Sequence, residues 1–115
     1  KNSKKLENIS ATFGEQNIKI DEKYQGSNID AIFGGVKLDL TEAELNKETV
    51  IKANAIFGGI EIILPKNVSV KINATPIFGG VSNKYQNSKD SDKVIYIEAV
   101  ALFGGVDIKR VQHKE

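Results

Sequence analysis

Residues 51–64 read Ile51-Lys-Ala-Asn-Ala-Ile-Phe-Gly-Gly-Ile-Glu-Ile-Ile-Leu64, two apolar alternations joined by a Phe-Gly-Gly motif. On both sides of the glycines every second residue is apolar: Ile51, Ala53, Ala55 and Phe57, then Ile60, Ile62 and Leu64. Alternation with a period of two is typical of a β-strand that buries one face. The phase slips by one residue at Gly58-Gly59, which indicates a turn or corner between two strands.

The same motif recurs along the whole chain and contains all five Phe and nine of the ten Gly. The copies are Phe13-Gly14, Phe33-Gly34-Gly35, Phe57-Gly58-Gly59, Phe78-Gly79-Gly80 and Phe103-Gly104-Gly105. Their Phe residues lie 20, 24, 21 and 25 positions apart, a period typical of stacked structural units. The first copy is a degenerate end copy, because Glu15 replaces the second Gly and Gln16 takes an apolar position.

Two folds explain the slip at Gly-Gly. In an antiparallel β-hairpin sandwich, Gly58-Gly59 forms a two-residue turn and Phe57 pairs with Ile60. In a β-solenoid the glycines form a corner or bulge at which the strand turns while both of its halves keep facing one interior. Alanine before nearly every Phe fits the narrow interior of a solenoid. The sequence therefore predicts a single all-β domain over residues 1–115, a right-handed β-solenoid of five FGG coils, with the hairpin sandwich as the alternative.

Alternation also predicts where the repeated side chains lie. Each Phe ends an inward alternation and is expected in a buried stack. The glycines that follow it are expected at positive φ, and the requirement for glycine is expected to be stricter at the first of the two. The residues before each Phe point outward by parity and form an aliphatic ridge, the candidate partner surface: Ile32, Ile56, Ile77 and Leu102. The alternative is that a loop covers these four as a second apolar cluster.

Two further features concern strand pairing. Pro76 lacks a backbone donor, which predicts a locally unpaired or bulged site in its strand. The last strand, Val106 to Arg110, is expected at a free edge, where it adds a second partner contact by edge pairing unless Lys109 and Arg110 block that pairing. The polar segment from Thr41 to Leu45 is compatible with one helical turn.

The composition excludes most classes of functional site. The 115 residues include 16 Lys+Arg and 15 Asp+Glu, too balanced a charge for a nucleic-acid-binding domain. Cysteine is absent and His113 is the single histidine, which excludes thiol chemistry and Cys/His metal sites. The acidic pairs Glu42/Glu44 and Asp90/Asp92 are interpreted as solvated loop residues. We therefore predict no catalytic residue, cofactor, metal or small-molecule substrate.

The order of submotifs resembles the C-terminal domain of LiaF-like proteins, the cell-wall-active antibiotic response family, which is related to toastrack β domains. The similarity extends over about Asn8 to Lys109 and is carried by four runs: Ala31-Ile-Phe-Gly-Gly-Val-Lys-Leu-Asp-Leu-Thr-Glu-Ala-Glu-Leu45, Glu48-Thr-Val-Ile51, Ala55-Ile-Phe-Gly-Gly-Ile-Glu-Ile-Ile-Leu-Pro65 and Ile77-Phe-Gly-Gly-Val81. This resemblance implies a domain attached to an N-terminal membrane region, outside a chain that begins at Lys1.

The resemblance also implies a function. Family members regulate, typically inhibit, a two-component sensor kinase of the cell-envelope stress response. We therefore expect a non-enzymatic, membrane-associated regulatory domain that contacts a membrane sensor histidine kinase or a second copy of itself, on an unspecified side of the membrane. The alternative of another class is a structural or adhesin-like β-solenoid at the cell surface, and a hydrolase is a distant third.

Overall fold

The computed structural model describes residues 7–83 and 91–110, which form β-strands joined by short turns. The strands are β1 (Glu7–Lys19), β2 (Lys23–Asp39), β3 (Glu44–Ala55), β4 (Gly59–Leu64), β5 (Ser69–Pro76), β6 (Gly80–Asn83), β7 (Val94–Ala101) and β8 (Gly105–Arg110). All of their pairings are parallel. A hairpin sandwich requires antiparallel neighbours, so this alternative is wrong and the predicted β-solenoid is confirmed.

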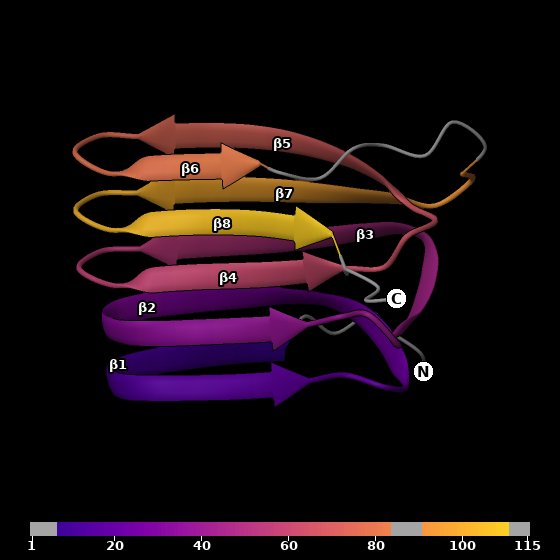
Figure 1. The fold of residues 1–115 in the computed structure, drawn as a ribbon, viewed down its shortest axis with the longest axis horizontal. Coiled ribbons are helices and arrows are strands. Elements are labelled where there is room, and N and C mark those ends of the chain that lie inside the picture. Colours follow the sequence, from indigo (N-terminus) through magenta and orange to yellow (C-terminus); the bar gives the residue numbers. More distant parts are fainter. Residues whose placement is uncertain (1–6, 84–90, 111–115) are drawn as a thin grey trace, which may run out of the picture.

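Each FGG copy forms the corner of one coil (Figure 1). β1 and β2 bend through their corners, whereas each later coil is divided there into two strands. Equivalent repeat positions face one another in neighbouring coils, as in the pairing of Phe13 with Phe33 and of Ala31 with Ala55. Every position of the repeat therefore becomes a row of side chains that runs along the solenoid axis.

The coils do not stack in chain order. β7 lies between β3 and β5, and β8 lies between β4 and β6, so the fifth coil is inserted between the third and the fourth (Figure 1). The expectation of a free edge at Val106 to Arg110 is therefore wrong, because β8 pairs with β4 along its whole length and with β6 from Gly105 to Ile108. The fourth coil, β5 and β6, lies at one end of the stack, and β1 lies at the other.

Pro76 is compatible with the position of the fourth coil at the end of the stack. The amides of Ser69 and Ile77 in the same coil both donate to the β7 coil, at 2.9 Å to the carbonyls of Lys93 and Ala101. Amide directions alternate along an extended strand, so the nitrogen of Pro76 faces the other side, which no described strand pairs. The missing N–H therefore costs no ladder bond. Pro76 keeps its register with Ala101, so the predicted local gap or bulge is wrong and the proline instead lies in an edge strand.

The interior is narrow and aliphatic, as predicted. The alanines of its thinnest part are almost fully buried, with 0 or 1% exposure at Ala31, Ala53, Ala55, Ala99 and Ala101. Larger side chains fill the opposite wall in the row of Leu38, Ile62 and Ile108. The polar interior residue Ser27 accepts a hydrogen bond from the Tyr24 hydroxyl at 2.6 Å. Burial of these rows stabilises the coils by removing apolar surface from water.

The Phe residues are not part of this interior, and the predicted buried stack is wrong. β3 ends at Ala55, and the next two amides, of Ile56 and Phe57, both donate to the preceding coil, at 2.9 and 2.8 Å. Consecutive amides of an extended strand point to opposite sides. The chain is therefore not extended at the corner, the alternation is lost, and Phe57 lies outside.

At the first corner Gly14 has a positive φ, as predicted, but at the later corners the glycines are required for a different reason. Among the described residues, positive φ occurs at Gly14 and Gly26, not at Gly58 or Gly59. A Cβ on Gly58 would lie 1.9 Å from the carbonyl oxygen of Gly34 in the neighbouring coil, whereas a Cβ on Gly59 would meet its nearest atom at 3.9 Å. The first glycine is thus the stricter position, as expected, because backbones approach closely there.

The predicted helical turn after β2 is a tight turn instead. The Asp39 carboxylate accepts hydrogen bonds from the amide of Thr41, at 2.9 Å, and from its hydroxyl. The amide of Ala43 donates to the carbonyl of Leu40 at 3.1 Å, and β3 begins at Glu44. An Asx-type turn of this kind satisfies the backbone locally and leads directly into the next coil.

Candidate functional site

Five phenylalanine rings form an exposed ladder along one corner of the solenoid. Their centroid separations are 5.5, 5.1, 5.0 and 5.1 Å and their interplanar angles are 1 to 6°, in the order Phe13, Phe33, Phe57, Phe103, Phe78. The three inner rings are 51 or 52% exposed, and the end rings Phe13 and Phe78 are 80 and 73% exposed. Stacking covers the ring faces, so the ring edges form the surface.

The four aliphatic residues predicted as a partner surface adjoin this ladder. Ile32, Ile56 and Leu102 are half-buried and Ile77 is 54% exposed, and none of them belongs to the interior core. Their outward placement agrees with the parity argument. We call the five rings together with Ile32, Ile56, Ile77 and Leu102 the apolar edge.

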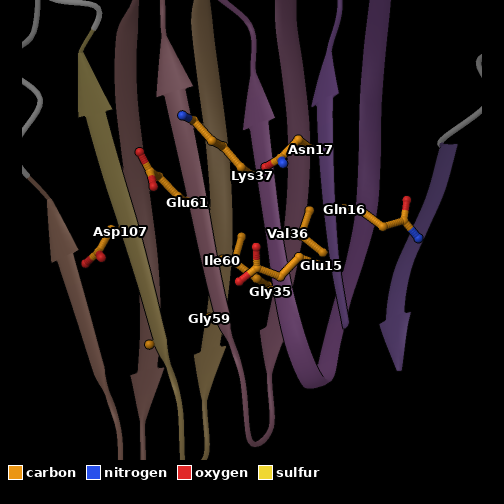
Figure 2. Close-up of a pocket in the computed structure, with 11 residues that line it drawn as sticks. Glu15, Gln16, Asn17, Gly35, Val36, Lys37, Gly59, Ile60, Glu61 and Asp107 are labelled. Atoms are coloured by element: carbon orange, nitrogen blue, oxygen red, sulfur yellow. The ribbon is translucent and has the colours of Figure 1, made fainter. Parts of the chain in front are cut away.

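A second feature, which the sequence reasoning missed, lies on the outer face just after the corner. It is a hollow of about 340 Å³ whose lining includes Gly35, Gly59 and Gly105, two residues after the Phe of their coils. Figure 2 shows this region, with Lys37, Glu61 and Asp107 on neighbouring strands. We call the hollow the glycine trough. The pattern Gly-apolar-charged after three of the corners, those of Phe33, Phe57 and Phe103, is the signal that predicts it, because parity places the glycine and the charged residue on one face.

Acidic groups dominate the flanks of the apolar edge. Glu15 extends across the trough, with its Cγ 3.6 Å from the position that a Cβ on Gly35 would occupy. Glu61 pairs with Lys109, at 3.3 Å between Nζ and Oε2. Within the described part of the chain, Glu15 and Asp107 form no ion pair. The flanks therefore present negative charge toward any group in the trough.

The other sequence candidates lie elsewhere. Glu42 and Glu44 are both exposed, Glu42 in the turn before β3 and Glu44 as the first residue of β3. The Glu42 carboxylate lies 3.8 Å from the Lys19 ammonium nitrogen. Asp90 and His113 fall outside the described residues. In the ranges 7–83 and 91–110, no three acidic or histidine side chains are gathered in a way that suits a metal ion. The arrangement suits binding of an apolar surface with adjacent positive charge.

Comparison with known families agrees with the repeat architecture. A model of the C-terminal region of LiaF, described as a cell wall-active antibiotics response protein, matches residues 12–101. The chain belongs to the LiaF-like family. The match runs from the first corner to the end of β7, so it covers the degenerate first corner, the next three FGG corners and the strand that leads to the fifth.

No match to the LiaF-like domain was found among curated proteins or among solved structures. The described part of the domain has no helix that is long and apolar enough to cross a membrane. Membership in the family associates the domain with the regulation of a response to cell-wall-active antibiotics.

Proposed function

We propose that this LiaF-like domain is a non-enzymatic regulatory domain of a membrane protein and modulates a two-component sensor kinase during cell-envelope stress. The family description supports a role in a response to cell-wall-active antibiotics. The observation that carries the proposal is the apolar edge, in which all five rings are at least 51% exposed. Large contiguous apolar surfaces on soluble domains typically bind partners.

The size of the apolar edge supports a protein contact. A Phe side chain offers about 200 Å² of surface, so rings with these exposed fractions leave roughly 600 Å² for a partner. Typical stable interfaces bury about 800 Å² on each side. The exposed surface of Ile77 and of the half-buried aliphatic residues brings the total for the apolar edge close to this area. Burial at about 25 cal/mol per Å² makes this surface the strongest apolar driving force on the domain for association.

The membrane attachment proposed for the whole protein would raise the encounter rate with a membrane kinase. A tether holds the domain close to its partner, so a surface of moderate affinity is sufficient for regulation. Residues 1–115 are proposed to act as one domain, with the apolar edge as its contact surface.

The test uses the whole protein that carries this domain, expressed with its sensor kinase in cells. Transcription from a promoter controlled by the response regulator is measured with and without a cell-wall-active antibiotic. Ile56→Ser and Phe57→Ser are expected to abolish the effect of the domain on kinase output, because both remove apolar surface from the centre of the apolar edge. Membrane levels and urea midpoints are measured for each variant.

Ile63→Ser is the matched control. Ile63 is also a half-buried isoleucine on the outer face of this coil, but it lies in β4, well past the corner. It is expected to lose a similar amount of apolar burial and to retain regulation. Unchanged regulation by Ile56→Ser and Phe57→Ser proteins that are folded and present at normal levels would contradict the proposal. A large loss of stability in Ile56→Ser alone would identify Ile56 as part of a second buried layer.

A further inference from the structure

We infer that the element bound on the apolar edge is an amphipathic α-helix of about four turns, parallel to the solenoid axis, with basic residues along one flank. This inference rests on the proposed function, since it specifies the partner of the same surface. The observations that carry it are the spacing of the ring ladder, its length, and the sign of the charge beside it.

The spacing of the ladder matches a helix. Successive ring centroids are 5.0 to 5.5 Å apart, and an α-helix rises about 5.4 Å per turn. One apolar side chain per turn, at i and i+3 or i+4, therefore stays in step with the gaps between ring edges. An extended strand presents same-face side chains about 6.6 Å apart, so it loses step within two or three rings.

The length of the ladder sets the length of the helix. The four separations from Phe13 to Phe78 together span about 21 Å, which corresponds to roughly 14 helical residues at 1.5 Å each. The glycine trough gives the flank of such a helix room, because Gly35, Gly59 and Gly105 place no side chain in the hollow. A helix about 10 Å wide thus rests on the rings and overhangs the trough.

The charge beside the ladder selects a basic flank. Within two rows of the rings lie Glu15, Glu61 and Asp107 on the trough side, Asp30 on the other side, and one basic residue, Lys37. Glu61 is paired with Lys109, so the excess of negative charge comes from Glu15, Asp107 and Asp30. The Asp30 carboxylate is exposed and accepts a hydrogen bond from the Asn54 side-chain amide at 3.0 Å. Lys or Arg on the bound helix complements this field, which repels an anionic lipid surface and the same edge of a second copy.

The test measures binding of stapled helical peptides to the 115-residue chain by fluorescence anisotropy. The probe is a 16-residue helix with Leu on one face and Lys on the flanks. One control peptide has the same residues in scrambled order, and another has Glu in place of Lys. The basic helix is expected to bind at least about tenfold more tightly than either control and to weaken as salt is raised.

Substitutions in the chain then assign the contacts. Phe57→Ser is expected to weaken binding at least about tenfold, while Ile63→Ser leaves it unchanged. Glu15→Gln with Asp107→Asn is expected to remove most of the salt dependence. Phe13→Ser with Phe78→Ser shortens the ladder at its most exposed rings and is expected to abolish the preference for a four-turn over a two-turn peptide. Circular dichroism and urea midpoints verify that each variant is folded.

Three results would overturn the inference: equal binding of the scrambled peptide, equal binding of the acidic helix, or unchanged binding by folded Phe57→Ser. Failure of the proposed function gives a different result, because it appears in the cellular assay as intact regulation by apolar-edge variants. Lost regulation in cells together with indifference to peptide helicity or charge would retain the apolar edge as an interface and reject only the helix.

Discussion

The ring of Phe78 stacks on that of Phe103, with centroids 5.1 Å apart and planes inclined by 6°. Phe57, one repeat before Phe78 in the sequence, also stacks on Phe103, at 5.0 Å. The last repeat therefore separates the third from the fourth, and the chain must return to insert its final coil. The stability of the fourth coil consequently depends on residues that follow it in the chain.

Engineered disulfides test this coil order. Asn54 and Val100 are register partners in β3 and β7, and Val100 also pairs with Thr75 in β5. Asn54→Cys with Val100→Cys is expected to oxidise readily, because paired strands lie about 4.8 Å apart, within the Cα range of disulfides. The natural sequence has no cysteine to interfere.

The matched pair is Asn54→Cys with Thr75→Cys, which would be neighbours if the coils stacked in chain order. In the observed order, two coil spacings separate them, about 10 Å, so no link is expected. Mobility on non-reducing gels and peptide mass spectrometry measure both. A link between 54 and 75 without one between 54 and 100 would disprove the inserted coil.

The two glycines of a corner are expected to respond very differently to alanine. Gly58→Ala places a Cβ 1.9 Å from the Gly34 carbonyl oxygen, and we expect a loss of about 3 kcal/mol or more in the free energy of unfolding. Gly59→Ala has ordinary contact distances and is expected to change stability by less than about 1 kcal/mol. Urea denaturation measures the free energy of unfolding of both variants. Similar losses of stability would refute the argument that the backbones of neighbouring coils approach closely at Gly58.

The ring ladder should contribute to stability according to position in the stack and not in the sequence. Phe57→Ala and Phe103→Ala remove rings with two stacking neighbours and are expected to cost about 2 kcal/mol, less than a fully buried aromatic. Phe13→Ala and Phe78→Ala remove end rings and are expected to cost about 1 kcal/mol. Thermal or urea unfolding measures all four. A Phe78→Ala cost equal to that of Phe57→Ala would argue against its end position.

Thr49 offers a stabilising substitution. Its side chain is almost fully buried, and its hydroxyl oxygen has no hydrogen-bond partner in the described structure. Thr49→Val replaces this hydroxyl with a methyl group of similar size, so we expect a gain of about 1 kcal/mol. The measurement is the urea midpoint, with Thr49→Ser as the control that keeps the hydroxyl and loses the methyl. A lower midpoint for Thr49→Val would show that the hydroxyl is satisfied.

Asp39 is expected to contribute a pH-dependent term. Burial by itself raises the pKa of Asp39, but the hydrogen bonds from Thr41 and the charges of Lys19 and Lys37 outweigh burial and hold this pKa below the ordinary value of an aspartate. Because the folded pKa is lowered, this stabilisation is present above the unfolded pKa, about 3.9, and is lost as the pH falls through the folded value. Thr41→Val removes the hydroxyl donor and should raise the pKa, as measured by carboxyl NMR titration. An unchanged pKa would assign the shift to the other groups.

The alternation of apolar residues was sufficient to predict the strands, the alanine-lined interior and the outward aliphatic residues. These features follow from local geometry, because a period of two in an extended chain assigns each side chain to a face. The sequence also contained the reason for the end position of the fourth coil. Its Pro76 lacks a ladder donor, and Asn83 occupies a row that is aliphatic in the coils of Leu38, Ile62 and Ile108.

Three features depended on contacts between coils and were beyond local pattern. The Phe rings lie outside because consecutive amides at the corner donate to the same neighbouring coil. The alternation of inward and outward side chains therefore ends before Phe57, and Phe57 does not point inward. The first glycine is required because a carbonyl of another coil leaves no room for a Cβ atom, as the Gly34 carbonyl does at Gly58. Coil order is a tertiary property, since five copies with similar rows can satisfy one another's hydrogen bonds in more than one order.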